Sequence, residues 1–401
     1  MTGRLSMLPM FIVTMGTLTL TAVAMTAPLV LAPVVTRELS LSPGLLGAYV
    51  SGLSLFSLLS SVGLGGLTRR FGAVRTSQLA ALMTAFGLGC AATATAAGLL
   101  VSTVFLGAGL SIITPAASHL ILRFTDPARL GLVFSIRQTG VPIGAAIAGA
   151  GIPPLLLLTG WQQVTLLIML VFVVSVVLLQ PLRAGLDDDR DAGASLRPAS
   201  IVKMIRQIAA DPVLRGIAIS GLGCSIVQNG LLSYLVTYLT LDLDYSLVAA
   251  GLVLTASQLV AIFGRMFWGG VSDRLGDPLG VLALISVLSA VICLALGFIT
   301  SSWPVSLVMF VAALFGGVAV SWNGVFLGGV ARFAPQGQVA MVTSGVMVSV
   351  YLGALIGPAL YAVILSVSGM YRAGYLLFAI VPLLAGISVQ SIRRRVRRAA
   401  G

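Results

Sequence analysis

Two arginines that interrupt apolar stretches are the side chains best suited to chemistry in this sequence. Arg265 lies in an apolar run that begins near Leu247, and it precedes a charged turn at Asp273 by eight residues. Eight residues of helix span about 12 Å, so a transmembrane helix would hold this guanidinium inside the hydrocarbon core. Burying an arginine there costs roughly 2.5–3.5 kcal/mol unless the side chain meets a partner or a wet cavity.

The second arginine, Arg137, lies ten residues beyond Pro127 and therefore about 15 Å deep in its own span. A guanidinium presents a fork of donors that binds a carboxylate through two parallel hydrogen bonds. The eleven acidic residues of the chain all lie at predicted span ends or in loops: Glu38, Asp126, Asp187, Asp188, Asp189, Asp191, Asp211, Asp242, Asp244, Asp273 and Asp277. The sequence therefore predicts an anionic substrate. The alternative is that each arginine binds backbone carbonyl groups freed by nearby glycines and prolines.

The composition is that of a polytopic membrane protein. Of the 401 residues, 58% are hydrophobic and only 8% are charged, whereas soluble domains carry about 25% charged residues. The net charge of +12 comes from basic residues between apolar runs, which follows the positive-inside rule and does not indicate nucleic-acid binding. The sequence holds no nucleotide loop, nucleophile triad or metal-ligand cluster, so we expect no enzyme activity, no cofactor and no metal site.

Hydropathy predicts an all-α membrane protein with twelve transmembrane helices in two pseudo-symmetric six-helix bundles. The predicted spans are roughly residues 8–34, 44–67, 74–96, 99–122, 130–156, 162–182, 213–239, 247–272, 278–299, 304–331, 338–367 and 372–392. Nearly all arginines fall on one side of these spans, and the opposite side holds only Arg37 and Arg372. We therefore expect an inner (plasma) membrane protein with both termini in the cytoplasm.

A charged segment between the sixth and seventh predicted spans divides the chain. We predict an N-terminal six-helix bundle over residues 1–182, a cytoplasmic linker over 183–212, and a C-terminal six-helix bundle with a basic tail over 213–401. The acidic run from Asp187 to Asp191 is interpreted as solvated linker, with a metal site as the weaker alternative. The arginine-rich tail is interpreted as a topology anchor, with binding of anionic membrane lipid as the alternative.

The two halves repeat a glycine-rich loop after their second spans, where residues 65–72 match residues 269–276. Six-plus-six repeats are typical of transporters whose site lies between the repeats. In the first loop Arg69 and Arg70 are consecutive. The second loop carries the pattern Gly-x-x-x-Asp-Arg-x-Gly, as Gly269, Asp273, Arg274 and Gly276.

This loop pattern resembles the signature of the major facilitator superfamily, and the resemblance covers essentially the full chain. The first loop departs from the family pattern, because Arg69 stands where aspartate is usual. The glycines and proline of the fifth span, at Gly140, Pro142 and Gly144, add a looser similarity that predicts close helix packing and a kink. The resemblance implies a gating role for the loop residues Asp273, Arg274, Gly269, Gly276 and Arg70.

An arginine just ahead of the second loop is similar to one in the oxalate–formate antiporter and monocarboxylate porter branch of that family. The resemblance implies that Arg265 binds the substrate carboxylate. Members of this branch also have a lysine in the eleventh span, whereas the single lysine here is Lys203, so Arg137 is the candidate replacement. In the resembling fold the fifth and eighth spans face each other between the halves, which would bring both arginines to one site.

Other polar residues of the predicted spans are candidate substrate ligands, and for each the alternative is hydrogen bonding or packing between helices. These candidates are Thr17, Asn229, Tyr234, Gln258 and Asn323. His119, the only histidine, lies four residues before Arg123. Histidine changes its charge between about pH 5 and pH 8, which suits proton coupling. A packing or gating role is the alternative for His119.

Together these features predict a monomeric secondary transporter of a small organic anion, either a mono- or a dicarboxylate. Its two halves would rock around the arginine site in alternating access. An empty, doubly positive site would resist that motion, which favours anion exchange or proton symport. One alternative is an efflux carrier for neutral or amphipathic molecules, supported by the glycines of the fifth span. A non-transporting membrane sensor is the alternative from another class, and the short loops disfavour it.

Overall fold

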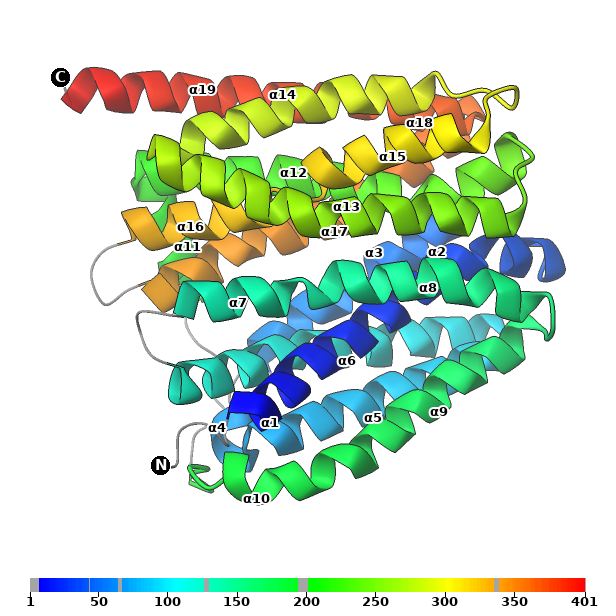
Figure 1. Ribbon diagram of the computed structural model, residues 1–401, viewed down its shortest axis with the longest axis horizontal. Helices are drawn as coiled ribbons and strands as arrows, with labels where there is room; N and C mark the ends of the chain where they lie inside the picture. The colour runs from blue at the N-terminus through cyan, green and yellow to red at the C-terminus, as the bar shows by residue number, and fades with distance from the viewer. Residues whose placement is uncertain are drawn as a thin grey trace. The chain divides into compact units, whose positions relative to one another are not determined.

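The computed structural model describes residues 7–42, 44–63, 67–125, 130–193, 201–334 and 339–400, and the regular structure within these ranges is helical (Figure 1). The chain divides into two compact units. Unit 1 comprises Met1–Leu39 and Gly52–Ala199, and unit 2 comprises Ser40–Ser51 and Ser200–Gly401. Helix α3 (Gly44–Gly63) therefore contributes residues to both units.

Unit 1 consists of long helices with several short helical segments at their ends. Besides its part of α3, its elements are α1 (Met7–Phe11), the π-helical η1 (Ile12–Gly16), α2 (Thr17–Glu38), α4 (Leu67–Phe71), α5 (Ala73–Ala92), α6 (Ala96–Phe124), α7 (Leu130–Gln138), α8 (Gly140–Leu156), α9 (Trp161–Leu179), the 3-10 helix η3 (Gln180–Leu182) and α10 (Arg183–Leu186).

Unit 2 has the same character. Its elements are α11 (Ile201–Ala210), α12 (Pro212–Thr237), the π-helical η4 (Tyr238–Asp242), α13 (Leu247–Leu275), α14 (Pro278–Gly297), α15 (Val305–Ala319), α16 (Asn323–Phe333), α17 (Val339–Ser368), α18 (Tyr371–Phe378) and α19 (Ile380–Ala400).

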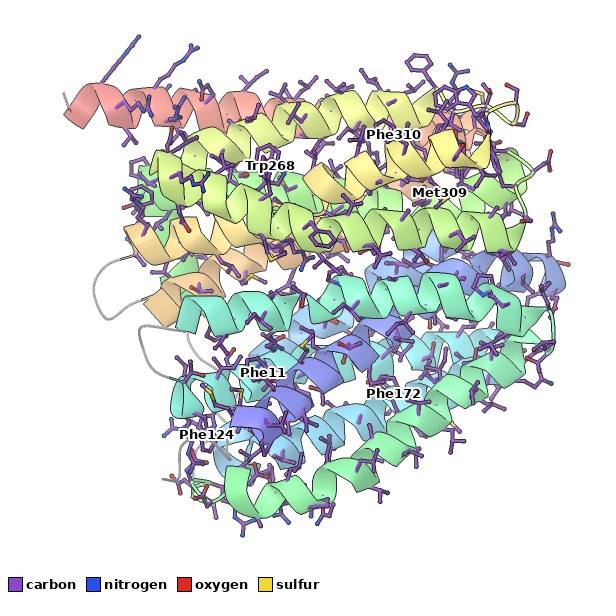
Figure 2. The ribbon with its side chains drawn as sticks, viewed as in Figure 1. Phe11, Phe124, Phe172, Trp268, Met309 and Phe310 are labelled. Carbon is purple, nitrogen blue, oxygen red and sulfur yellow. The ribbon has the colours of Figure 1, made fainter. Side chains whose placement is uncertain are left out.

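Ten helices among the described residues are long and apolar enough to cross a membrane, and Gly44–Ser60 is a shorter apolar helix. The predicted count of twelve is therefore not confirmed. The expected span 74–96 corresponds to α5, whose first turns carry Arg75 and Gln78 and are correspondingly polar. Large apolar side chains point outward from several helices, as Phe310 does on α15 with 60% of its surface exposed (Figure 2). Such exposed apolar surface is expected where a helix meets lipid.

Close helix packing in unit 1 depends on glycine, as the fifth-span pattern predicted. A Cβ atom on Gly144 of α8 would collide with the backbone carbonyl oxygen of Thr19 on α2, so only glycine permits this approach. Gly107 of α6 approaches α3 in the same way, because its Cβ would lie 2.5 Å from the carbonyl oxygen of Leu53. The core of the unit includes Phe172 of α9, which is 2% exposed (Figure 2).

In unit 2, α12 and α17 pack with similar closeness. A Cβ on Gly353 of α17 would lie 2.6 Å from Cβ of Ser225 on α12, and the hydroxyl of Ser225 donates a hydrogen bond to the carbonyl of Val350 at 2.7 Å. A hydrophobic core that includes Trp322 and Phe326 joins α12, α14 and α16. This packing fixes the position of the tenth predicted span, which carries candidate site residues.

Candidate functional site

The tenth predicted span is interrupted near its middle. Helix α15 ends at Ala319 and α16 begins at Asn323. Irregular backbone at membrane depth occurs only where protein or a water-filled cavity surrounds it. Helix α13 packs along this interruption: a Cβ on Gly264 would lie 2.5 Å from both the carbonyl oxygen of Gly317 and the hydroxyl of Ser321.

Two side chains satisfy backbone carbonyl groups beside the interruption. The indole nitrogen of Trp268 donates a hydrogen bond to the carbonyl of Gly317 at 2.9 Å, and the hydroxyl of Ser321 donates to the carbonyl of Gly316 at 2.8 Å. Figure 2 shows Trp268 on α13. These two carbonyl groups thus have side-chain donors other than Arg265.

Arg265 lies on α13 between these contacts and is partly exposed. A Cβ on Gly324 would lie 3.3 Å from the carbonyl oxygen of Arg265, so the first turn of α16 adjoins the backbone at this arginine. Asn323 starts α16, is partly exposed, and its side-chain amide nitrogen lies 3.5 Å from the carbonyl oxygen of Val320. The first N–H groups of a helix lack intrahelical acceptors and carry partial positive charge, so this end of α16 adds to the positive potential there.

The remaining polar candidates of unit 2 are held by other protein groups. Gln258 is 2% exposed, and its amide nitrogen lies 3.4 Å from the hydroxyl of Ser257. The amide of Asn229 donates to the carbonyl of Ser225 one turn earlier at 2.9 Å. Asn229 remains partly exposed, whereas Gln258 is buried. The structure therefore favours packing for Gln258 and leaves Asn229 accessible.

Tyr234 lies in an aromatic cluster. It is 0% exposed, and its ring stacks on Tyr361 with centroids 4.2 Å apart. Tyr238, Tyr371 and Tyr375 contribute further ring contacts to the same cluster. Complete burial among aromatic rings favours packing over substrate contact for Tyr234.

Gln228 is a site neighbour that the sequence analysis missed. Its side-chain oxygen accepts a hydrogen bond at 2.9 Å from the indole nitrogen of Trp322, the residue directly before α16. Gln228 therefore links α12 to the interruption of the tenth span. The sequence feature that could have identified Gln228 is a glutamine inside an otherwise apolar span, directly before Asn229.

Unit 1 also places its arginine beside an interrupted helix. Arg137 lies in the last turn of α7 and is 2% exposed. After α7 ends at Gln138, the hydroxyl of Thr139 donates to the carbonyl of Ile136 at 2.6 Å, and α8 begins at Gly140. This is the kink that the proline and glycine pattern predicted.

The first span faces that kink with irregular backbone of its own. A Cβ on Gly140 would lie 3.0 Å from the hydroxyl of Thr19 and 3.4 Å from the carbonyl oxygen of Met15. Met15 belongs to the π-helical segment η1, and such segments are frequent at functional sites. Thr17 directly follows η1, is buried, and donates to the carbonyl of Val13 at 2.5 Å.

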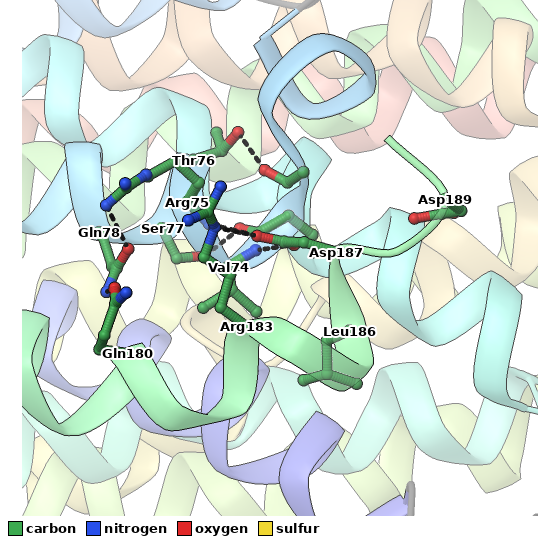
Figure 3. A network of polar contacts seen from close by, with 12 residues as sticks. Val74, Arg75, Thr76, Ser77, Gln78, Gln180, Arg183, Leu186, Asp187 and Asp189 are labelled. Carbon is green, nitrogen blue, oxygen red and sulfur yellow. Dashed lines mark hydrogen bonds and ion pairs between the residues drawn. The ribbon is translucent and has the colours of Figure 1, made fainter. Parts of the chain in front are cut away.

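The acidic run after α10, which the sequence analysis interprets as solvated linker, is exposed at Asp188, Asp189 and Asp191 but buried at Asp187. Asp187 is 4% exposed, and its carboxylate accepts hydrogen bonds from the backbone N–H groups of Val74 at 2.8 Å and Arg75 at 3.0 Å (Figure 3). It therefore caps α5, where a carboxylate is favoured by the helix dipole. Gly72, with φ of +93°, leaves the space that Asp187 fills. Residues 194–200 of the predicted linker lie outside the described residues.

The next two aspartates bind the end of α6. Arg123 pairs with Asp188 at 2.6 Å and with Asp189 at 2.9 Å. The hydrogen bond from Arg123 holds the pKa of Asp188 below its ordinary value. The Nε2 atom of His119 lies 2.7 Å from a carboxylate oxygen of Asp189. This contact joins α6 to the segment after α10.

The end of each glycine-rich loop requires glycine, because Gly276 has φ of +61° and the matching Gly72 has φ of +93°. Gly276 ends α13, and its N–H donates to the carbonyl of Ser272 at 2.9 Å. Apart from its chain neighbours and the backbone of its own helix, no atom of the described residues lies within 4 Å of the Cβ position of Gly269. Asp273 and Arg274 are exposed. In the first loop Arg70 is also exposed, with its guanidinium 5.7 Å from the ring of Phe71, and Gly65 and Gly66 lie outside the described residues.

Asp277, just beyond the second loop, forms ion pairs with two arginines of α19. Its carboxylate pairs with Arg393 at 2.5 Å and with Arg397 at 2.9 Å, and it accepts a hydrogen bond from the N–H of Gly280 at 3.0 Å. Burial opposes ionisation of this carboxyl, but the contacts with Arg393, Gly280 and Arg397 outweigh burial and lower its pKa. The sequence analysis assigned Asp277 no role.

A family model agrees with this architecture. The model of the Major Facilitator Superfamily matches residues 12–328. The comparison with curated proteins found no match.

Solved transporter structures share the fold. A bacterial homolog of the human lysosomal transporter Spinster, inward-facing and unoccupied, is similar with a TM-score of 0.77, 17% identity and 98% coverage of both chains. The peptide transporter POT in complex with sulfate gives a TM-score of 0.74 at 17% identity, covering 98% of this chain and 95% of that one. A variant of the E. coli fucose:proton symporter gives 0.65 at 16% identity, covering 97% and 99%.

Proposed function

Because the chain belongs to the Major Facilitator Superfamily, whose fold it shares with solved transporters, we propose that it is a secondary transporter of a small organic anion. The proposed substrate is a mono- or dicarboxylate, exchanged for another anion or carried together with a proton. The observation that carries this proposal is the position of Arg265, partly exposed beside the interrupted tenth span.

The distribution of acidic residues in unit 2 supports an anionic partner for Arg265. The five carboxylates of this unit lie at helix ends or in turns: Asp211, Asp242, Asp244, Asp273 and Asp277. The nearest along α13 is Asp273, eight residues away, which corresponds to about 12 Å. A substrate carboxylate would match the two-pronged donor geometry of the guanidinium.

The start of α16 supports the same assignment. Half-helices that begin at membrane depth direct their positive ends toward anionic substrate groups in other transporter folds. Here the backbone at Arg265 adjoins the first turn of α16, and we propose that the guanidinium and this helix end act on one anion. We assign Asn323 and Asn229 as supporting polar contacts, because both are partly exposed.

Arg137 of unit 1 is also proposed to bind a substrate anion. It shares with Arg265 a position beside an interrupted helix. A bound anion would offset the positive charge of such an arginine and permit the conformational change, which favours exchange or proton symport over passive uniport. The distribution of basic residues supports both termini in the cytoplasm. We further propose that the protein resides in the plasma membrane and acts as a monomer.

Ligand stabilisation and uptake test the proposal. The purified protein is heated with mono- and dicarboxylates and with neutral lipophilic compounds, and the same carboxylates are offered to proteoliposomes. We expect carboxylates to raise the melting temperature of wild type. In Arg265→Gln we expect this effect to vanish and uptake to fall about 10- to 100-fold, the range of one to two charge-assisted hydrogen bonds. Arg265→Lys should be intermediate, because lysine keeps the charge but loses the two-pronged geometry.

The matched control is Arg206→Gln, which removes an exposed arginine from α11 of the same unit. It should behave as wild type in both assays. Full carboxylate uptake by Arg265→Gln contradicts the assigned role. Stabilisation by neutral lipophilic compounds but not by carboxylates would instead support the efflux carrier, for which the close packing of α8 on α2 at Gly144 remains the favouring observation.

A further inference from the structure

The last turns of α19 carry five arginines, and one aspartate divides them into two faces. Arg393 and Arg397 are four residues apart and therefore lie on one side of the helix. Both bind the same carboxylate oxygen of Asp277, at 2.5 Å and 2.9 Å. Asp277 also caps α14 through the N–H of Gly280. These contacts fix the rotation of α19 about its axis at this end.

The other three arginines form a second face. Arg394, Arg395 and Arg398 are exposed, and no ion pair involves them among the residues that the structure describes. At about 100° of rotation per residue, the three side chains fall within an arc of roughly 100°. That arc is centred more than about 120° away from the pair that binds Asp277. The basic face therefore points away from the carboxylate that neutralises its neighbours.

The basic face continues an apolar face of the same helix. Ile380, Leu384 and Ile387 are 51%, 61% and 65% exposed, and the helical repeat places them in the same arc as the three arginines. Val389 and Ala385, on the opposite side, are 0% and 6% exposed. These residues all belong to the membrane-span candidate Tyr371–Arg398. An exposed apolar stripe that turns basic within about two turns is the pattern expected where a helix passes from acyl chains to headgroups.

We propose that the face formed by Arg394, Arg395 and Arg398 binds the headgroup phosphates of anionic phospholipids in the leaflet where α19 ends. Guanidinium groups bind phosphate oxygens bidentately. Basic residues at a membrane surface also gain from the negative potential of anionic lipid. Asp277 orients the surface by holding Arg393 and Arg397 at the start of α14, so that the remaining three arginines are presented to lipid. This inference is independent of the transported substrate.

Binding of defined lipids to the purified full chain tests the proposal. Mixed micelles that contain either phosphatidylglycerol or phosphatidylcholine are titrated onto delipidated protein, and bound lipid is counted by native mass spectrometry. We expect wild type to prefer phosphatidylglycerol, and the triple variant R394Q/R395Q/R398Q to lose at least about tenfold in its apparent affinity, given a gain of roughly fivefold per arginine. R394K/R395K/R398K should retain most of the binding because its charge is unchanged.

A control variant separates a local surface from net charge. R37Q/R372Q removes two exposed arginines outside this helix end and should leave binding unchanged. An equal loss in this control, or wild-type binding by the triple glutamine variant, overturns the proposal. In wild type alone, phosphatidylglycerol binding should weaken as salt rises, because screening acts on exposed charges. Salt-independent binding, or saturation of the surface by inorganic phosphate in place of lipid, likewise overturns it.

Discussion

The indole nitrogen of Trp268 donates a hydrogen bond to the carbonyl of Gly317 across 2.9 Å, and this bond ties α13 to α15 one turn after Arg265. Trp268 is 8% exposed, so water cannot readily replace it as the donor. The bond therefore fixes α13 against α15 close to Arg265. It makes Trp268 a positioning residue for the proposed anion site.

Trp268→Phe should keep the ring and remove the donor. We expect a loss of about 1–3 kcal/mol in stability, the cost of leaving a buried carbonyl without a partner. We also expect weaker stabilisation by carboxylates, because Arg265 is no longer held by a fixed neighbouring turn. Thermal unfolding with and without ligand measures both effects. Phe263→Leu, at a position 67% exposed on the same helix, is the control and should change neither.

Gly276→Ala should destabilise the protein, because φ of +61° places a Cβ in the left-handed region. The expected cost is about 1–2 kcal/mol. Gly269→Ala offers a matched comparison within the same loop motif: its φ is helical and its Cβ position is open, so stability should be unchanged or slightly higher. Equal melting temperatures for the two variants would contradict this distinction.

Asp187→Asn should loosen the junction between α5 and α10. The substitution removes the negative charge from the start of α5 and weakens two hydrogen bonds to backbone N–H groups. We expect a loss of about 1 kcal/mol in thermal stability and faster hydrogen exchange at Val74 and Arg75. Asp191→Asn, at an exposed position of the same run, should leave the exchange of those two amides at the wild-type rate.

The lowered pKa of Asp277 predicts a stability change in acid. A carboxyl whose pKa is lower in the folded state contributes its full stability above the unfolded pKa, about 3.9, and loses it as pH falls through the folded value. Melting temperatures of wild type should therefore decline below about pH 4. Asp277→Asn should be less stable than wild type near neutrality and should show a flatter acid decline. If the melting temperatures of the two proteins fall equally as the pH decreases, Asp277 is not the cause of the decline.

Much of the architecture follows from the sequence because it depends on local apolar patterns. Apolar runs predicted most of the long helices, and the glycines of the fifth span predicted both the close approach at Gly144 and the kink after Arg137. The interruption before Asn323 was not predicted, because Val320, Ser321 and Trp322 do not carry a proline or a glycine that would break a helix. It is stabilised by side chains of α13 and α12, which are remote in sequence.

The acidic run from Asp187 to Asp191 also has features that local sequence patterns could not predict. Charge density indicated a solvated segment from Asp187 to Asp191, and it did not indicate that Asp187 is buried or that Asp187, Asp188 and Asp189 have partners on α5 and α6. Those partners are more than sixty residues away, as for His119 and Asp189. Tyr234 likewise looked available as a polar side chain in a span, but its neighbours Tyr361 and Tyr371 come from the end of the chain. Contacts between residues so far apart in the sequence can be identified only in the folded structure.

The interruption of the tenth span also sets how that span can bend. It leaves α16 as a separate rod of 11 residues, about 16 Å long, whose far end carries Arg332 and Phe333. A tilt of about 10° at Trp322 would move that far end by roughly 3 Å. The carbonyl groups of Gly316 and Gly317 already have side-chain donors, so this tilt need not break a helical hydrogen bond at either of them. The interruption thus allows the cytoplasm-proximal half of the span, as predicted from Arg332, to tilt as one short helix while α15 stays in place.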